Sequence, residues 1–122
     1  MLFKEALIGL TDNTGAKIVK VIGTYKFNLI FSKIGALFIS SLTKVIPRRK
    51  LKKGSLFRSY TVRVRFPTYR DSGFYIFCST NKAVLFKTSE NLPVANRIKG
   101  YVLIEIFFND KIPFPNVTIY SV

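Results

Sequence analysis

Apolar and polar side chains alternate over residues 60–66, and this alternation restricts what the chain can fold into. Successive side chains of an extended strand point to opposite faces, so every second residue shares a face. A helix would need an apolar period of about 3.6 residues, which this segment lacks. The pattern therefore predicts a half-buried strand, with an apolar face of Tyr60, Val62, Val64 and Phe66 and a cationic outer face of Thr61, Arg63 and Arg65.

Other short segments have the same strand-like character, at a spacing of about ten residues. Further strands are predicted at residues 17–22, 36–42, 75–78 and 83–87, with turns at residues 12–15, 71–73 and 79–81. The apolar run at residues 101–108 fits either a strand or a short helix. The chain is thus predicted to be all-β, as a small closed barrel or a sandwich. No repeat or linker divides it, so residues 1–122 are expected to form a single domain.

Positive charge is concentrated in one half of the chain. The 122 residues include 20 Lys and Arg but only 6 Asp and Glu, for a net charge of +14. Residues 13–70 hold 14 of these basic residues and no acid, so the other 6 basic residues are balanced by all 6 acids. Such a surface repels itself unless a polyanion neutralises it. The distribution therefore predicts a nucleic acid or an anionic membrane as the partner.

The densest basic segment is KVIPRRKLKK at residues 44–53, which contains six basic side chains. Pro47 disfavours a helix here, and Gly54 supplies a turn into the next segment. We expect a loop between two strands that grips several phosphates. A Lys/Arg run can also serve as a nuclear localisation signal, but that role would leave the other basic residues of this half unexplained.

The chain lacks the residues that most enzyme chemistry requires. It has no histidine, which is the usual general base and the commonest metal ligand. Its single cysteine, Cys78, lies in an apolar strand pattern and is expected to be a packed core thiol. The acids are scattered, and the glycines lack phosphate-loop spacing. We therefore predict no catalytic residues, no cofactor and no metal site.

The N-terminal segment resembles neither a signal peptide nor a transit peptide. The longest weakly charged stretch, residues 27–43, is interrupted by Lys33, so no membrane insertion is expected. The chain is rich in Phe, Tyr, Ile and Lys, the residues with A/T-rich codons. This usage suggests synthesis inside an organelle, although an A/T-rich bacterial genome would give the same bias.

Several segments resemble one known family, the universal large-subunit ribosomal protein L-fourteen. The VIPRRKLKKG segment at residues 45–54 resembles the family's AIPRGKVKKGD, and DNTGA at residues 12–16 resembles its ADNSGA. Val62 and Arg63 match its VVVR strand, and Gly73 matches its DG turn. The similarity continues through its N-A-A-V-L strand at residues 81–85 and its TRIFGPV segment at residues 97–100, to Glu105 of its RELR segment.

The resemblance implies a closed five-stranded β-barrel, with a core at about residues 1–87 and a C-terminal extension of loops and short helical segments at about residues 88–122. It implies a structural constituent of the large ribosomal subunit that binds large-subunit rRNA near the subunit interface. A bridge to small-subunit rRNA, contacts with neighbouring ribosomal proteins and docking of a ribosome-silencing factor are implied too. We expect these side chains to bind RNA: Lys17, Lys44, Arg48, Arg49, Lys50, Lys52, Lys53, Arg63, Arg65 and Arg70.

The chain also departs from the family pattern. Arg49 replaces a glycine of the basic loop, while Phe66 and Tyr69 stand where the family is usually basic. After Glu105 the usual basic helix gives way to an apolar, Pro-containing tail. This divergence suggests a mitochondrial ribosome rather than a plastid or bacterial one. Two alternatives remain open: a free single-strand-binding barrel of the OB or cold-shock type that uses exposed Tyr25 or Tyr69, and a peripheral membrane protein.

Overall fold

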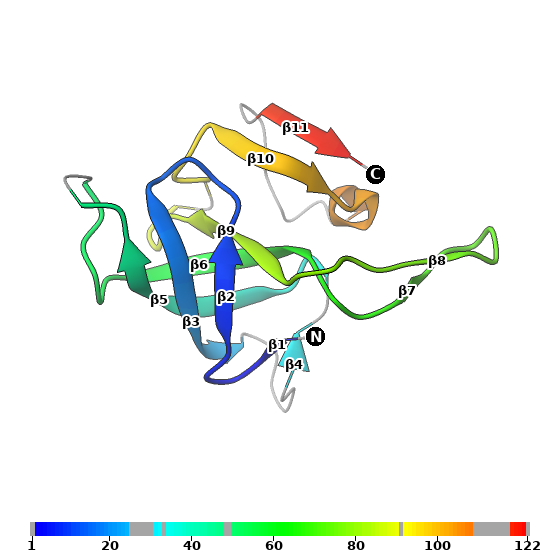
Figure 1. The fold of residues 1–122 in the computed structure, drawn as a ribbon, viewed down its shortest axis with the longest axis horizontal. Helices are drawn as coiled ribbons and strands as arrows, with labels where there is room; N and C mark the ends of the chain where they lie inside the picture. Colours follow the sequence, from blue (N-terminus) through cyan, green and yellow to red (C-terminus); the bar gives the residue numbers. More distant parts are fainter. Residues whose placement is uncertain are drawn as a thin grey trace.

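The structure is a computed structural model that describes residues 2–24, 31–32, 34–47, 50–90, 92–108 and 118–121. Five strands close into a barrel in the order β2, β3, β5, β6, β9 (Figure 1). Their bounds are β2 (Leu7–Leu10), β3 (Ala16–Thr24), β5 (Leu37–Val45), β6 (Leu56–Arg63) and β9 (Lys82–Phe86). Neighbours pair antiparallel except β2 and β9, whose parallel pairing closes the barrel. The expected all-β fold with a closed five-stranded barrel is confirmed.

The other elements are short and lie outside the barrel. Strand β1 (Leu2–Phe3) pairs with β4 (Phe31–Ser32), and β7 (Thr68–Tyr69) pairs with β8 (Tyr75–Ile76) in a hairpin. Strand β10 (Arg97–Val102) leads into the 3-10 helix η1 (Ile104–Phe108) and pairs in parallel with β11 (Thr118–Ser121). Residues 101–108 therefore contain both of the expected alternatives, the end of a strand followed by a short helix. No helix in the described ranges is long and apolar enough to cross a membrane.

The barrel interior is filled by one face of each strand. Its buried cluster consists of Ile8, Ala16, Val19, Val21, Phe38, Leu42, Ala83 and Leu85. Two serines also face inward, and the hydroxyls of Ser40 and Ser59 are hydrogen-bonded to each other at 2.8 Å. This bond satisfies two polar groups that would otherwise be costly to bury.

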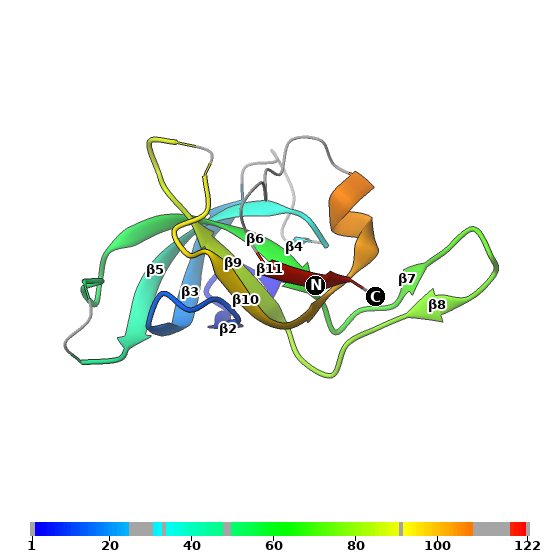
Figure 2. The same ribbon diagram turned by 90° about the horizontal axis from the view of Figure 1, so that it is seen from above.

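A second cluster lies between the outside of the barrel and the C-terminal extension. It joins side chains of β6 and β9 to the segment that follows, and it comprises Tyr60, Val62, Val84, Phe86, Ile98, Val102 and Ile106. Strand β9 is buried on both faces for this reason, since Ala83 and Leu85 face the interior while Val84 and Phe86 face the extension. Figure 2 shows β10 and η1 lying across this side of the barrel.

The same arrangement corrects the facing predicted for residues 60–66. Thr61 was expected on the exposed face but is 0% exposed, while Phe66 was expected in the core and is 39% exposed. Strand β6 ends at Arg63, where its register with β9 shifts, so the alternation does not continue to Phe66. Beyond the strand, Arg65 is exposed as expected. Within the strand, Tyr60 and Val62 pack under the extension and Thr61 is buried on the barrel side. The strand is therefore buried on both sides.

Two projections extend from opposite ends of the longest axis of the molecule (Figures 1 and 2). One is the loop between β5 and β6, and the other is the β7–β8 hairpin. Both turns use a glycine with a left-handed backbone: Gly54 has φ 87° and Gly73 has φ 85°. These were the expected turn positions, and glycine adopts this conformation without a Cβ clash.

Candidate nucleic-acid interface

The basic loop between β5 and β6 is anchored at both ends by backbone hydrogen bonds. The amide of Gly54 donates to the Leu42 carbonyl at 2.7 Å, and the Leu42 amide donates to the Ser55 carbonyl at 3.0 Å. On the other side, the Ile46 amide donates to the Gly15 carbonyl at 2.8 Å. Leu51 packs against the barrel core. The loop is thus pinned to the barrel, which reduces the conformational entropy lost when it binds a partner.

Three lysines of this loop, Lys50, Lys52 and Lys53, are exposed. Lys17 and Lys44 are exposed at its base, where the register of β3 with β5 shifts on both sides of the pair Ile18–Lys44. The structure therefore brings five of the ten expected RNA-binding residues to one end of the barrel. Arg48 and Arg49 belong to the same loop but lie outside the described residues.

These five ammonium groups have no carboxylate partner within the part of the chain that the structure describes. The ion pairs found there join Lys20 to Glu5 and Arg70 to Glu105. Unpaired cations clustered on one surface raise the local positive potential and attract anions such as phosphate. Over the described residues, no group of three or more Cys, Asp or Glu side chains could hold a metal ion.

Arg63 lies at the far end of β6 from this loop, and its side chain is used within the molecule. Its Nε donates to the Tyr101 carbonyl at 2.7 Å and its Nη2 to the Lys99 carbonyl at 2.6 Å. The guanidinium also lies over the Tyr101 ring, 4.7 Å from the centroid. These contacts join the end of β6 to β10 and hold the extension against the barrel.

Arg70 makes a similar link from the hairpin. Its Nε and Nη2 donate to the two carboxylate oxygens of Glu105 at 2.6 and 3.3 Å, in a bidentate pair that is mostly shielded from solvent. Arg65 differs from both, because its side chain is exposed while its backbone amide donates to Asn81 Oδ1 at 2.8 Å. Arg63 and Arg70 therefore have a structural role that the charge pattern did not reveal.

Sequence reasoning also missed the aromatic surface of the hairpin. Tyr69 was expected to be exposed and is; Tyr75, Phe77 and Phe74 are exposed as well. Tyr25, the other aromatic expected to be exposed, lies outside the described residues. The signal that could have found this surface is the uninterrupted apolar run at residues 74–78, because alternate side chains of an extended segment face opposite sides.

A comparison with known protein families matches most of the chain. The family described as ribosomal protein L14p/L23e matches residues 1–115 of the chain. The chain belongs to this family. As an L14p/L23e protein it has a structural role in the large ribosomal subunit rather than an enzymatic one, and its place is the ribosome. Membership in the L14p/L23e family also implies contact with rRNA and with other ribosomal proteins.

Proposed function

We propose that this L14p/L23e protein binds large-subunit rRNA through the basic end of its barrel. The proposed contacts are Lys17, Lys44, Arg48, Arg49, Lys50, Lys52 and Lys53. The observation that carries this proposal is the set of exposed lysines at residues 17, 44, 50, 52 and 53 around a loop fixed by backbone hydrogen bonds. None of them has a carboxylate partner among the residues that the structure describes. Folded RNA is recognised largely through its shape and its phosphates, and this surface suits that kind of recognition.

The proposed RNA surface also includes three arginines away from the basic loop: Arg63, Arg65 and Arg70. Arg65 is exposed and can contact a phosphate directly. Arg63 adds positive potential, whereas the charge of Arg70 is neutralised by Glu105. The hydrogen bonds of both arginines hold the extension in place. The proposal therefore expects substitutions of Arg63 and Arg70 to affect folding as well as RNA binding.

We further propose the assembly in which this surface works. The chain acts as one domain of 122 residues near the subunit interface, where it contributes to a bridge with small-subunit rRNA and contacts neighbouring ribosomal proteins. A ribosome-silencing factor is a further proposed partner. The residue usage supports a gene in an organelle, and the divergence from the family pattern supports a mitochondrial ribosome.

Sedimentation tests this proposal. The endogenous protein should migrate with large ribosomal subunits at moderate salt, and ribonuclease treatment should release it from that fraction. A variant with Lys50→Gln, Lys52→Gln and Lys53→Gln should compete poorly with the wild-type chain for incorporation. A protein that sediments free of large subunits would contradict the proposal. Separate sedimentation of the organelle and cytosolic fractions tests the mitochondrial placement.

A further inference from the structure

The β7–β8 hairpin has two different faces. On the face toward the body of the protein, Ile76 packs with the buried cluster of Val64, Cys78 and Leu103. Arg70 reaches the extension from the same hairpin through its ion pair with Glu105. Tyr75 and Phe77 alternate with Ile76 and Cys78 along the chain, so they point the other way. The inward face is therefore covered by the protein itself, whereas the outward face is exposed to solvent.

The outward face is made of three aromatic rings, which we call the aromatic face: Tyr69, Tyr75 and Phe77. They are 78%, 59% and 58% exposed. Tyr69 and Tyr75 are directly opposite in the hairpin register, with ring centroids 5.9 Å apart. The rings of Tyr75 and Phe77 are 6.2 Å apart and within 14° of parallel. The three rings form a continuous surface in open solvent.

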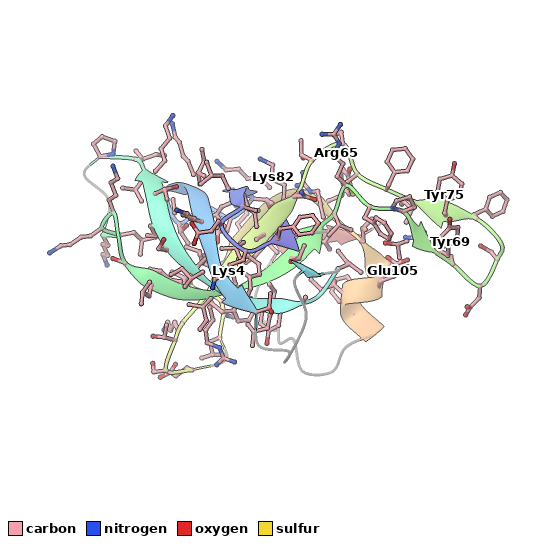
Figure 3. All side chains as sticks on the ribbon, turned by 90° about the horizontal axis from the view of Figure 1, so that it is seen from below. Lys4, Arg65, Tyr69, Tyr75, Lys82 and Glu105 are labelled. Atoms are coloured by element: carbon pink, nitrogen blue, oxygen red, sulfur yellow. The ribbon has the colours of Figure 1, made fainter. Side chains whose placement is uncertain are left out.

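The charges around this face favour an anionic partner at its base. Arg65 is exposed where the hairpin leaves the barrel, as Figure 3 shows, and it has no ion pair among the described residues. The charge of Arg70 is neutralised by Glu105 on the inward side. The hairpin's own carboxylate, Asp71, lies at the turn, away from Arg65. A chain of phosphates can therefore approach the rings from the barrel side.

We propose that the aromatic face is a stacking surface for unpaired RNA bases, a role that rests on the RNA binding proposed above. Bases stack on exposed aromatic rings whatever their sequence, and a nearby cation pairs with the linking phosphate. All three side chains of the face present π-faces and none is aliphatic. Arg65 supplies the cation. The basic loop would then hold folded RNA at one end of the barrel while the hairpin holds single-stranded nucleotides at the other (Figure 1).

An oligonucleotide comparison with the full-length protein tests this. A 12-nucleotide oligoadenylate is compared with an abasic RNA of the same length, which keeps the phosphates and lacks the bases. The wild-type protein should bind the oligoadenylate more tightly, by roughly fivefold to a hundredfold for each stacked base. A variant with Tyr69→Leu, Tyr75→Leu and Phe77→Leu should bind both RNAs with the affinity that the wild type has for the abasic one.

A ring-preserving variant serves as the matched control. Tyr69→Phe with Tyr75→Phe keeps every π-face, so it should keep the preference for bases. Equal binding of both RNAs by the wild type would overturn the stacking role and leave phosphate binding by the basic loop intact. A preference that persists in the leucine variant would also overturn it, and loss of subunit incorporation in that variant would then indicate a protein contact. Failure to bind either RNA would contradict the proposed function as well.

Discussion

The guanidinium of Arg63 lies 4.7 Å from the ring centroid of Tyr101 and donates to the carbonyl of the same residue at 2.7 Å. One arginine thus engages both the backbone and the side chain of a residue 38 positions away. A second hydrogen bond reaches the carbonyl of Lys99. Arg63 therefore fixes β10 to the end of β6, and the C-terminal extension depends on it.

Arg63→Lys should lower the free energy of unfolding by about 1–3 kcal/mol, because an ammonium cannot reproduce the two directed N–H donors or the stacked guanidinium. Equilibrium urea denaturation of the full-length protein measures this. Arg65→Lys is the matched control, since the Arg65 side chain is exposed and its hydrogen bond comes from the backbone. Equal stability of the two variants would show that Arg63 does not anchor the extension.

Gly100→Ala should be destabilising by at least about 1–2 kcal/mol, since φ at Gly100 is 79°, in the left-handed region. An added Cβ would also lie 2.6 Å from Nη2 of Arg63, so it would disturb the same link. Gly23→Ala is the control, because an added Cβ there meets nothing within 4 Å and its φ is not left-handed. Similar melting temperatures for the two variants would argue against a strained, crowded position at Gly100.

Asp12 should make stability depend on pH in a direction opposite to most carboxylates. Burial raises its pKa above the ordinary value of 3.8, although Leu85 N–H and the Thr14 hydroxyl donate to its oxygens. An acid with a raised pKa in the folded state stabilises the protein fully below 3.8, and this contribution is lost as pH rises through the raised value. The stability of the wild type relative to Asp12→Asn should therefore decrease from acidic to neutral pH.

Urea titrations of both proteins at several pH values check this prediction. Glu5 does not confuse the comparison, because it is present in both proteins. Its own pKa is lowered by the hydrogen bond from Lys20, so its contribution to stability is lost in acid instead. A difference between wild type and Asp12→Asn that stays constant or grows with pH would contradict the expected titration of Asp12.

Neutralising the basic loop should weaken RNA binding through lost phosphate contacts. A variant with Lys50→Gln, Lys52→Gln and Lys53→Gln should reduce the slope of log affinity against log salt by roughly 2 to 3, at about 0.7–0.9 per phosphate. The control removes three exposed charges elsewhere, with Lys4→Gln, Lys87→Gln and Arg97→Gln. Filter binding to an rRNA fragment over a salt series measures both. An equal loss of slope in both variants would indicate a diffuse charge effect rather than a contact by this loop.

Local patterns predicted much of this fold, because turns and strand character depend on neighbouring residues. Gly54 and Gly73 stand at turns as expected, and β3, β5 and β9 lie close to their predicted ranges. Strand β2 was not predicted, since four residues carry too short a pattern. The facing of Thr61 was wrong because closure of the barrel and burial under the extension depend on pairings distant in the chain.

The candidate site was likewise predictable only where it depends on neighbouring residues. The cluster at residues 44–53 is contiguous, so its charge is visible in the sequence. Whether a given arginine faces solvent is not visible, because its partner can be far along the chain. Arg70 and Glu105 are 35 residues apart, and nothing in their local sequence indicates the ion pair. The aromatic face was hidden for a related reason, because the contact of Tyr69 with Tyr75 depends on the pairing of the two hairpin strands.

Protein–RNA crosslinking in intact ribosomes tests the central claim most directly. Lysine-reactive or photochemical crosslinks mapped by mass spectrometry should join residues 44–53 to large-subunit rRNA, at positions that cluster in a few helices. The protein that stays bound to large subunits at high salt should carry these crosslinks. Crosslinks from this loop to protein alone, or none while other parts of the chain crosslink to rRNA, would contradict an RNA-binding role for the basic end of the barrel.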